Sequence, residues 1–184
     1  TPVAEAIARC EEVLATAEAS RRSTGIVTKH LALLHAKEGD FDRGRALCAQ
    51  ARALLEDAGA RMVNFGGSLD AGAIELMAGD AAAAERELLR DYQTLVDLNE
   101  TYFLPSLAAL LAEALWRQER YEEAEAYCRT AQELTAPDDV WTQAAWHSAK
   151  AKVLVRREGA VDEAIGLARE AVSLLSTTDA PVWR

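Results

Sequence analysis

Apolar residues recur along most of the chain at spacings of three and four, and polar residues fill the positions between them. Between residues 102 and 118, for example, one side of a helix collects Leu107, Leu110, Leu111, Ala114 and Leu115. This pattern predicts amphipathic helices and favours an all-α fold. The windows that show it are 2–19, 21–38, 41–57, 60–78, 81–98, 102–118, 121–135, 139–158 and 161–176.

From residue 21 onward the predicted helices come in pairs, with a repeat period of about 40 residues. The turn inside each pair starts at Gly39, Gly79, Glu119 and Gly159, so the step is constant. Five residues after each start stands a small residue, which lets two helices approach closely; these residues are Gly44, Ala84, Ala124 and Ala164. Because a unit of this size cannot bury its apolar face alone, we expect the units to stack as an α-solenoid.

We therefore expect one domain over residues 1–184, a right-handed superhelix of about nine antiparallel helices. Its parts would be a half repeat at 1–19, helix pairs at 20–58, 59–99, 100–137 and 138–178, and a truncated next repeat at 179–184. A slightly shorter step aligns Ala6, Cys10 and Val13 with the packed positions Gly44, Cys48 and Ala51 of the next second helix. Such a slice of a solenoid would expose apolar surface at both ends, so a homodimer through uncapped ends is one expectation.

Local signals agree with these boundaries. Asp40, Asp80 and the Asp138–Asp139 pair stand where a helix N-cap is wanted. Pro105 falls in a first turn, where a missing N–H costs little. The Gly66–Gly67 pair inside the window 60–78 predicts a bend or a close helix contact.

The turn Gly39-Asp-Phe, followed by small residues at fixed places, resembles the tetratricopeptide repeat (TPR), although the period is 40 rather than 34. A narrower resemblance is to the C-terminal repeat region of large bacterial signalling proteins. Those proteins carry a class III cyclase-like or transcription-activator domain, then a STAND-type ATPase, then long tetratricopeptide-like repeats. The stretches that carry it are 75–80, 84–88, 111–115, 120–125, 136–140 and 149–154. The resemblance implies a scaffold or sensor segment of a signalling or transcription-regulating protein.

Composition and charge narrow the function classes. Half of the 184 residues are hydrophobic, and 20 basic against 30 acidic residues give a net charge of −10. Residues 59–140 hold 6 basic and 16 acidic residues, so the acidity belongs to the middle of the chain. This segment would repel phosphate, so we expect no nucleic-acid binding. The longest apolar run, 107–112, is too short to cross a membrane. Three widely spaced cysteines without a CxxC pair favour the cytoplasm.

Catalytic motifs are missing from the sequence. It contains no phosphate-binding glycine loop, no HExxH and no GxSxG. His30 and His35 are five residues apart and point about 140° apart on a helix, which does not suit a shared metal. Cys48 and Cys128 hold equivalent repeat positions, which is typical of core residues. The sequence thus predicts no enzyme, no metal and no cofactor.

In tetratricopeptide-like arrays the first helix of each pair lines the concave face, and the resemblance therefore implies a set of groove positions. Those that bear charged or aromatic side chains are Lys29, Lys37, Glu113, Trp116, Arg117, Trp146, Arg156 and Arg157. Trp and Arg are frequent in binding surfaces. Ordinary solenoid packing is the competing interpretation, with a local cation–π contact between Trp146 and Lys150.

Two functional hypotheses follow. The first is an interaction module whose concave face binds a peptide, a partner protein or another domain of its own parent protein. The second is a small-molecule sensor, as in maltose-activator-like STAND regulators, with the inducer received by Trp116, Trp146, Arg156 and Arg157.

Overall fold

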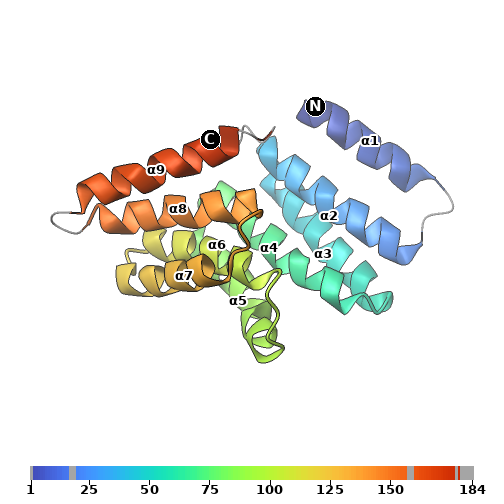
Figure 1. Ribbon diagram of the computed structural model, residues 1–184. Helices are drawn as coiled ribbons and strands as arrows, with labels where there is room; N and C mark the ends of the chain where they lie inside the picture. The colour runs from blue at the N-terminus through green and yellow to red at the C-terminus, as the bar shows by residue number, and fades with distance from the viewer. Residues whose placement is uncertain (1, 17–19, 157–159, 177, 179–184) are drawn as a thin grey trace. The chain divides into compact units, whose positions relative to one another are not determined.

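The chain is described by a computed structural model, which places residues 2–16, 20–156, 160–176 and 178. In this part of the chain all regular structure is helical and no strand occurs, which confirms the all-α prediction. The helices (Figure 1) are α1 (Val3–Ala15), α2 (Arg21–Lys37), α3 (Phe41–Asp57), α4 (Arg61–Ala78), α5 (Ala81–Asp97), α6 (Leu104–Arg117), α7 (Tyr121–Leu134), α8 (Val140–Leu154) and α9 (Val161–Ser176).

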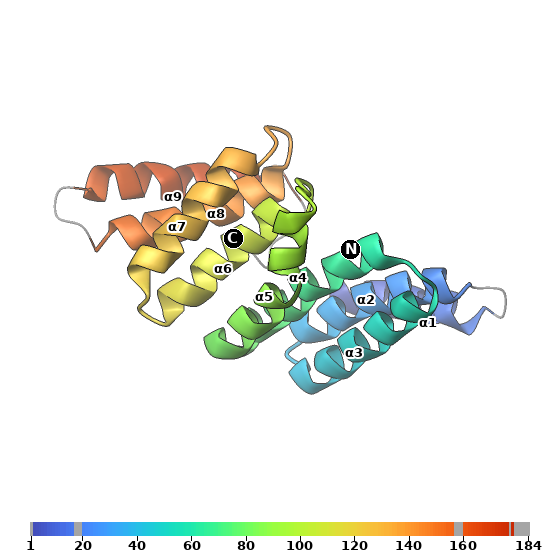
Figure 2. The ribbon, with the colours of Figure 1, turned by 90° about the horizontal axis from the view of Figure 1, so that it is seen from below.

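The helices form two compact units, Thr1–Glu87 and Leu88–Arg184. In the first unit α3 packs on α2, and α4 packs on both. The second unit repeats this arrangement, because α7 packs on α6 and α8 packs on both, while α9 packs on α8 (Figure 2). The pairs α2–α3 and α6–α7 therefore each receive the first helix of the next pair, which is the neighbour-to-neighbour packing of an α-solenoid.

The helix boundaries lie within a few residues of the predicted windows, because capping residues fix them. Asp40, Asp80 and Asp139 each accept a hydrogen bond from the backbone N–H three residues later, at 3.1, 2.8 and 3.0 Å. These bonds satisfy donors that have no partner within the helix. Pro105 lies in the first turn of α6, as its missing N–H allows. The prediction of these caps is confirmed.

Small residues at the repeated position bring the helices of a pair together. Gly44, Ala84, Ala124 and Ala164 are all buried. A Cβ atom on Gly44 would lie only 3.1 Å from the carbonyl oxygen of Ala32 on α2. The close approach of α2 and α3 therefore depends on the absence of a side chain at this position, which confirms the predicted role of the small residues.

The Gly66–Gly67 pair does not interrupt its helix. α4 continues without a break from Arg61 to Ala78. A Cβ atom on Gly67 would meet only the Asn64 side chain, at an ordinary contact distance of 3.6 Å. α4 is therefore continuous through the two glycines, and no close helix contact is present at Gly67.

The first helix is rotated relative to the predicted alignment. Val3, Ile7, Cys10 and Leu14 of α1 pack against the core of the first unit, whereas Val13 is 47% exposed. The alignment that equated Val13 with buried positions of later helices is therefore wrong at that residue. The spacing of the packed residues, at i, i+4, i+7 and i+11, is what an amphipathic helix requires.

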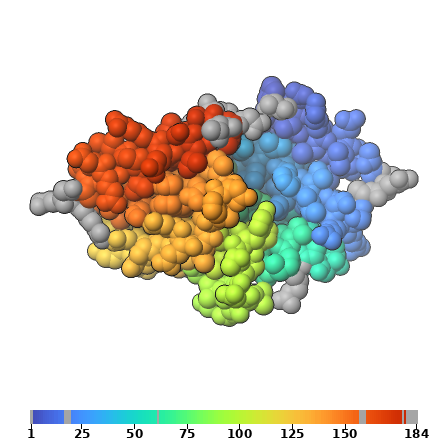
Figure 3. All heavy atoms as spheres, in the orientation of Figure 1, coloured from blue at the N-terminus to red at the C-terminus, as the bar shows by residue number. Residues whose placement is uncertain are grey.

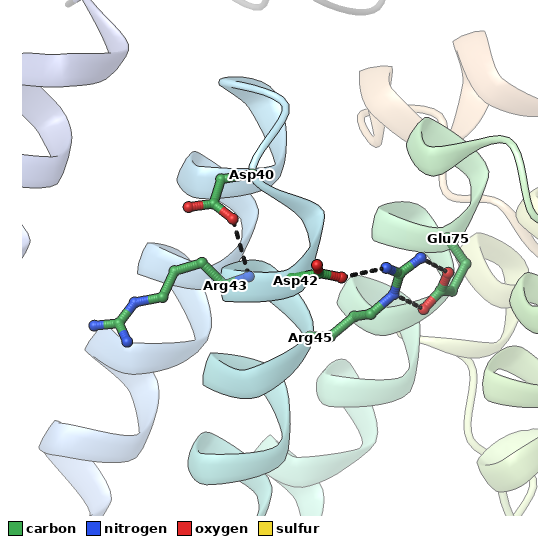
Figure 4. A network of polar contacts seen from close by, with 5 residues as sticks. All are labelled: Asp40, Asp42, Arg43, Arg45 and Glu75. Atoms are coloured by element: carbon green, nitrogen blue, oxygen red, sulfur yellow. Dashed lines mark hydrogen bonds and ion pairs between the residues drawn. The ribbon is translucent and has the colours of Figure 1, made fainter.

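An ion pair joins α3 to α4 in the first unit (Figure 4). The guanidinium of Arg45 donates to both carboxylate oxygens of Glu75, at 2.8 and 2.7 Å, and to Asp42 at 3.0 Å. Glu75 raises the pKa of Arg45, chiefly through these hydrogen bonds. A two-pronged contact of this kind fixes orientation as well as distance, so it sets how α4 lies on α3.

The turn before α7 carries a strained residue. Gly39 and Gly79 adopt φ values of 88° and 85° in their turns, and at the equivalent position Glu119 has φ 62°. A residue with a Cβ atom pays a steric cost in this left-handed conformation. We expect Glu119→Gly to raise the free energy of unfolding by about 1 kcal/mol, measured by urea denaturation. Glu119→Ala, which keeps the Cβ atom, should bring no such gain.

Candidate functional site

Four side chains on α6 and α8 meet in the second unit. Glu113 accepts a hydrogen bond from Arg117 Nε through one carboxylate oxygen, at 2.8 Å. Its other oxygen accepts from Lys152 Nζ at 2.6 Å. Only 13% of the Glu113 side chain is exposed, so the carboxylate acts as a buried anchor for two cations. We call Glu113, Trp116, Arg117 and Lys152 the α6–α8 cluster.

Trp116 is held in place by this arrangement. Its indole Nε1 donates to the backbone carbonyl of Lys152 at 3.2 Å, and Lys152 Nζ lies 5.4 Å from the ring centroid. The ring packs against Leu115, Ala124 and Val153 and stays half-buried. A partly exposed aromatic residue that its neighbours already hold in place provides contact area with little entropy to lose.

Cations gather near Trp116 at the ends of α6 and α8. Arg117 and Lys152 share the carboxylate of Glu113, and the Arg156 guanidinium lies 4.9 Å from the Tyr121 ring. Arg117 and Lys152 lie in the last turns of α6 and α8, where the helix dipole favours cations. Two cations therefore meet one carboxylate where these two helices end.

A second pair of opposite charges lies on the first helices of the first unit. Lys29 Nζ of α2 is 3.3 Å from Asp70 Oδ2 of α4, and the two side chains are only 15% and 12% exposed. Asp70 Oδ2 has no hydrogen bond of good geometry. Burial raises the pKa of the Asp70 carboxyl, and Lys29 opposes this rise without cancelling it. The pair therefore joins α2 to α4 at a desolvation cost.

The raised pKa of Asp70 predicts a pH dependence of stability. An acid with a higher pKa in the folded state binds its proton more tightly there than in the unfolded chain. Its stabilising contribution is therefore complete below its ordinary pKa and is lost as the pH rises through the folded-state value. We expect the free energy of unfolding of Asp70→Asn, minus that of the unchanged chain, to increase as the pH rises from about 4 towards neutrality. Urea denaturation at each pH measures this difference. A flat or decreasing difference would contradict this.

The other predicted groove residues are distributed over different environments. Lys37 is half-buried at the end of α2, and Arg157 lies outside the described residues. Trp146 is only 6% exposed and packs in the core against Ala108, Ala109 and Ala131. Lys150 lies 5.9 Å from its ring, so the local cation–π contact is present.

The structure thus brings together Glu113, Trp116 and Arg117 of the predicted set, and separates them from the Trp146 ring. Two pairings are absent from the sequence predictions. They are the contacts of Lys152 with Glu113 and Trp116, and the ion pair of Lys29 with Asp70. A signal for both existed, because the members of each pair are separated in sequence by close to one repeat. Residues one repeat apart on first helices lie side by side because those helices pack together.

His147 has a carboxylate partner that the sequence did not reveal. Its Nδ1 lies 2.7 Å from the Gln143 carbonyl and its Nε2 lies 3.1 Å from Glu170 on α9. These residues border a shallow pocket of about 430 Å³, lined by Pro137, Gln143, His147, Glu170, Ser173 and Leu174. The volume is in the range of small-ligand sites, although the His147 nitrogens already have partners.

Cys48 and Cys128 lack the character of nucleophiles. Burial raises the pKa of Cys48 and of Cys128 to about 12, so both are thiols at neutral pH. Within the described ranges, no three His, Cys, Asp or Glu side chains come together as a metal site would require. His30 contacts the Ile26 carbonyl at 2.7 Å through Nδ1.

The described helices are too short or too polar for any of them to span a bilayer. The α6–α8 cluster is the arrangement that combines a fixed, partly open aromatic ring with several cations. No family model matches this chain, and no curated protein or solved structure shows significant similarity to it, so the resemblance to the repeat region of STAND regulators stays a prediction from the sequence.

Proposed function

We propose that this chain is a non-catalytic helical-repeat scaffold that binds an acidic, partly apolar segment on the α6–α8 cluster. The segment belongs to a partner protein or to another domain of the same parent protein. The observation that carries the proposal is the half-buried Trp116 indole, held by Lys152 next to Arg117. Following the resemblance to STAND regulators, the parent is a cytoplasmic bacterial signalling or transcription regulator.

The chemistry of the cluster supports this choice of partner. A Trp ring and Arg side chains dominate the energy of many protein interfaces. Because Trp116 and Lys152 are already ordered by contacts within the unit, binding loses little side-chain entropy. Carboxylates on the partner find the surplus positive charge, while an apolar side chain covers the open side of the indole.

Selection of peptides from a random displayed library on the immobilised chain tests the proposal. We expect the enriched peptides to contain several Asp or Glu residues beside at least one large apolar residue. Their affinity should fall about tenfold for Lys152→Glu and for Arg156→Glu, because each change turns attraction into repulsion. Arg156 is exposed on the second unit, so its replacement leaves the fold intact.

Arg129→Glu is the matched control, because it makes the same change of charge at an exposed position on α7. Peptides that bind all these variants equally would show attraction to the whole chain, and would contradict a site at the α6–α8 cluster. Enrichment without acidic residues would equally contradict the proposed partner chemistry.

The pocket beside His147 supports a second candidate, a small-molecule sensor. Its lining offers Gln143, His147, Glu170 and Ser173 around an apolar floor of Pro137 and Leu174. A ligand there would bridge α8 and α9, displacing the exposed Glu170 side chain from His147. A thermal-shift panel of small polar metabolites tests this: a ligand of this pocket stabilises the unchanged chain and leaves His147→Ala unaffected. A panel without any stabilising compound would count against the sensor.

A further inference from the structure

α9 carries an apolar face that no described helix of its unit covers. Val161, Ile165 and Val172 are 51%, 42% and 57% exposed, and Ala168 between them is exposed as well. Their spacing of four, three and four residues places them in one line along the helix. We call these four residues the α9 stripe. Figure 3 shows α9, in red, at the surface. Its other face, with Ala164, Ala171 and Leu175, is buried.

The same positions one repeat earlier are covered by a helix. On α7 they are Tyr121, Glu125, Cys128 and Gln132. Cys128 is buried against Ala149 of α8, and Gln132 accepts a hydrogen bond from Lys150 of α8 at 3.0 Å. The α9 stripe therefore corresponds to the face of α7 on which α8 packs.

The first unit shows the same use of this face. Arg45 of α3 is equivalent to Ile165, three repeats earlier. It is the residue that binds Glu75 of α4 at 2.7 Å (Figure 4). Because α3 and α7 both receive a helix at these positions, the α9 stripe has the geometry of a helix-docking face.

The chemistry of the stripe indicates which helix it receives. The stripe consists of Val, Ile, Ala and Val, so it offers no partner for a charge such as Glu75 or Lys150. A matching helix therefore presents an uncharged apolar line of the same spacing. α9 itself has this line, and we propose that a second copy of the chain docks on α9 through its own α9, in antiparallel orientation.

The antiparallel register pairs large side chains with small or equal ones. With the two-fold axis between residues 166 and 167, Ile165 of one copy lies opposite Ala168 of the second copy. Val161 likewise lies opposite Val172 of the second copy. This spacing is that of the a and d positions of a coiled coil, so the two lines interdigitate over the length of the helix.

The charges beside the stripe fit the same register. Asp162 and Arg169 are exposed, seven residues apart, on one flank of α9. A two-fold axis places equal flanks against each other, so Asp162 of each copy lies beside Arg169 of the other. The pairing therefore gains two ion pairs. The opposite flank bears only Ala164 and Ala171, which are small and already packed within the unit.

Sedimentation equilibrium over a series of protein concentrations tests the dimer. We expect monomer at low concentration and dimer at high concentration. Ile165→Glu and Val172→Glu should each abolish the dimer, because they place a carboxylate inside an apolar line. Val13→Glu is the matched control: it changes a similarly exposed valine on α1 and should leave the dimer unchanged. Circular dichroism checks that every variant remains helical.

Charge reversal tests the register. Asp162→Arg and Arg169→Asp should each weaken the dimer about tenfold, since each places like charges together at two symmetric sites. The double variant should restore the original affinity. A chain that stays monomeric at every concentration overturns the proposal, and so does a dimer that survives Ile165→Glu. Arg156→Glu, which tests the α6–α8 cluster, should leave the dimer intact, so the two proposals fail separately.

Discussion

Leu111→Ala should lower the free energy of unfolding by about 3 kcal/mol. The Leu111 side chain is completely buried on α6, in the second unit, where α7 and α8 both pack. Removing three carbon atoms there loses apolar burial and leaves a cavity that the surrounding helices fill only in part. Urea unfolding followed by circular dichroism measures the change.

Leu98→Ala is the matched control, because the same side chain is 58% exposed just after α5. We expect it to change the free energy of unfolding by less than about 0.5 kcal/mol. Equal effects of the two substitutions would contradict the assignment of α6 as the core helix of its unit.

The fold was predictable because local and repeated signals agree. Helix boundaries follow from caps such as Asp40 and Asp139, which act on the next three residues and need no tertiary information. The constant step between the turns made the pairing of helices visible, and the small residue at Ala124 marked where they touch. The face that each helix buries follows from its apolar line, once its phase is read correctly.

That phase was misread at α1. The predicted alignment matched Val13 to buried positions of later helices, while the core-facing line runs through Ile7 and Leu14. A shift of one residue rotates a helix face by about 100°, so a small error in alignment exchanges buried and exposed positions. At Gly67 the close helix contact that the glycine pair offered is absent, because only the Asn64 side chain lies near the place of a Cβ atom.

The sequence predicted which types of residue form the candidate site better than it predicted which side chains contact one another there. Trp116 and Trp146 both lie on first helices, yet Trp116 is half-buried and Trp146 lies in the core. The difference depends on the rotation of each helix about its axis, which packing against two neighbours decides. The partners Lys152 and Asp70 required the first helices to be in contact, a fact that no single helix contains.

Trp116→Ala should reduce the affinity of the selected acidic peptides at least thirtyfold, which corresponds to about 2 kcal/mol. The change removes the aromatic surface and also frees Lys152, whose carbonyl loses its indole donor and whose ammonium group loses the ring beneath it. Trp116→Phe keeps a ring but not the N–H group, so its loss should be smaller, about three- to tenfold. Fluorescence anisotropy of a labelled peptide measures both.

Tyr102→Ala provides the control, because Tyr102 is a freely exposed aromatic residue of the same unit, 75% open to solvent, and lies outside the α6–α8 cluster. If exposed aromatic surface alone attracted the peptides, the two alanine variants would lose similar affinity. If the ordered pairing of Trp116 with Lys152 makes the site, only the Trp116 variant loses it, and the order of effects is alanine, then phenylalanine, then the Tyr102 control. A different order of affinity losses would show that the α6–α8 cluster only packs α6 against α8 and is not a binding surface. Packing alone predicts that Trp116→Ala lowers the stability of the fold without a specific loss of affinity for acidic peptides.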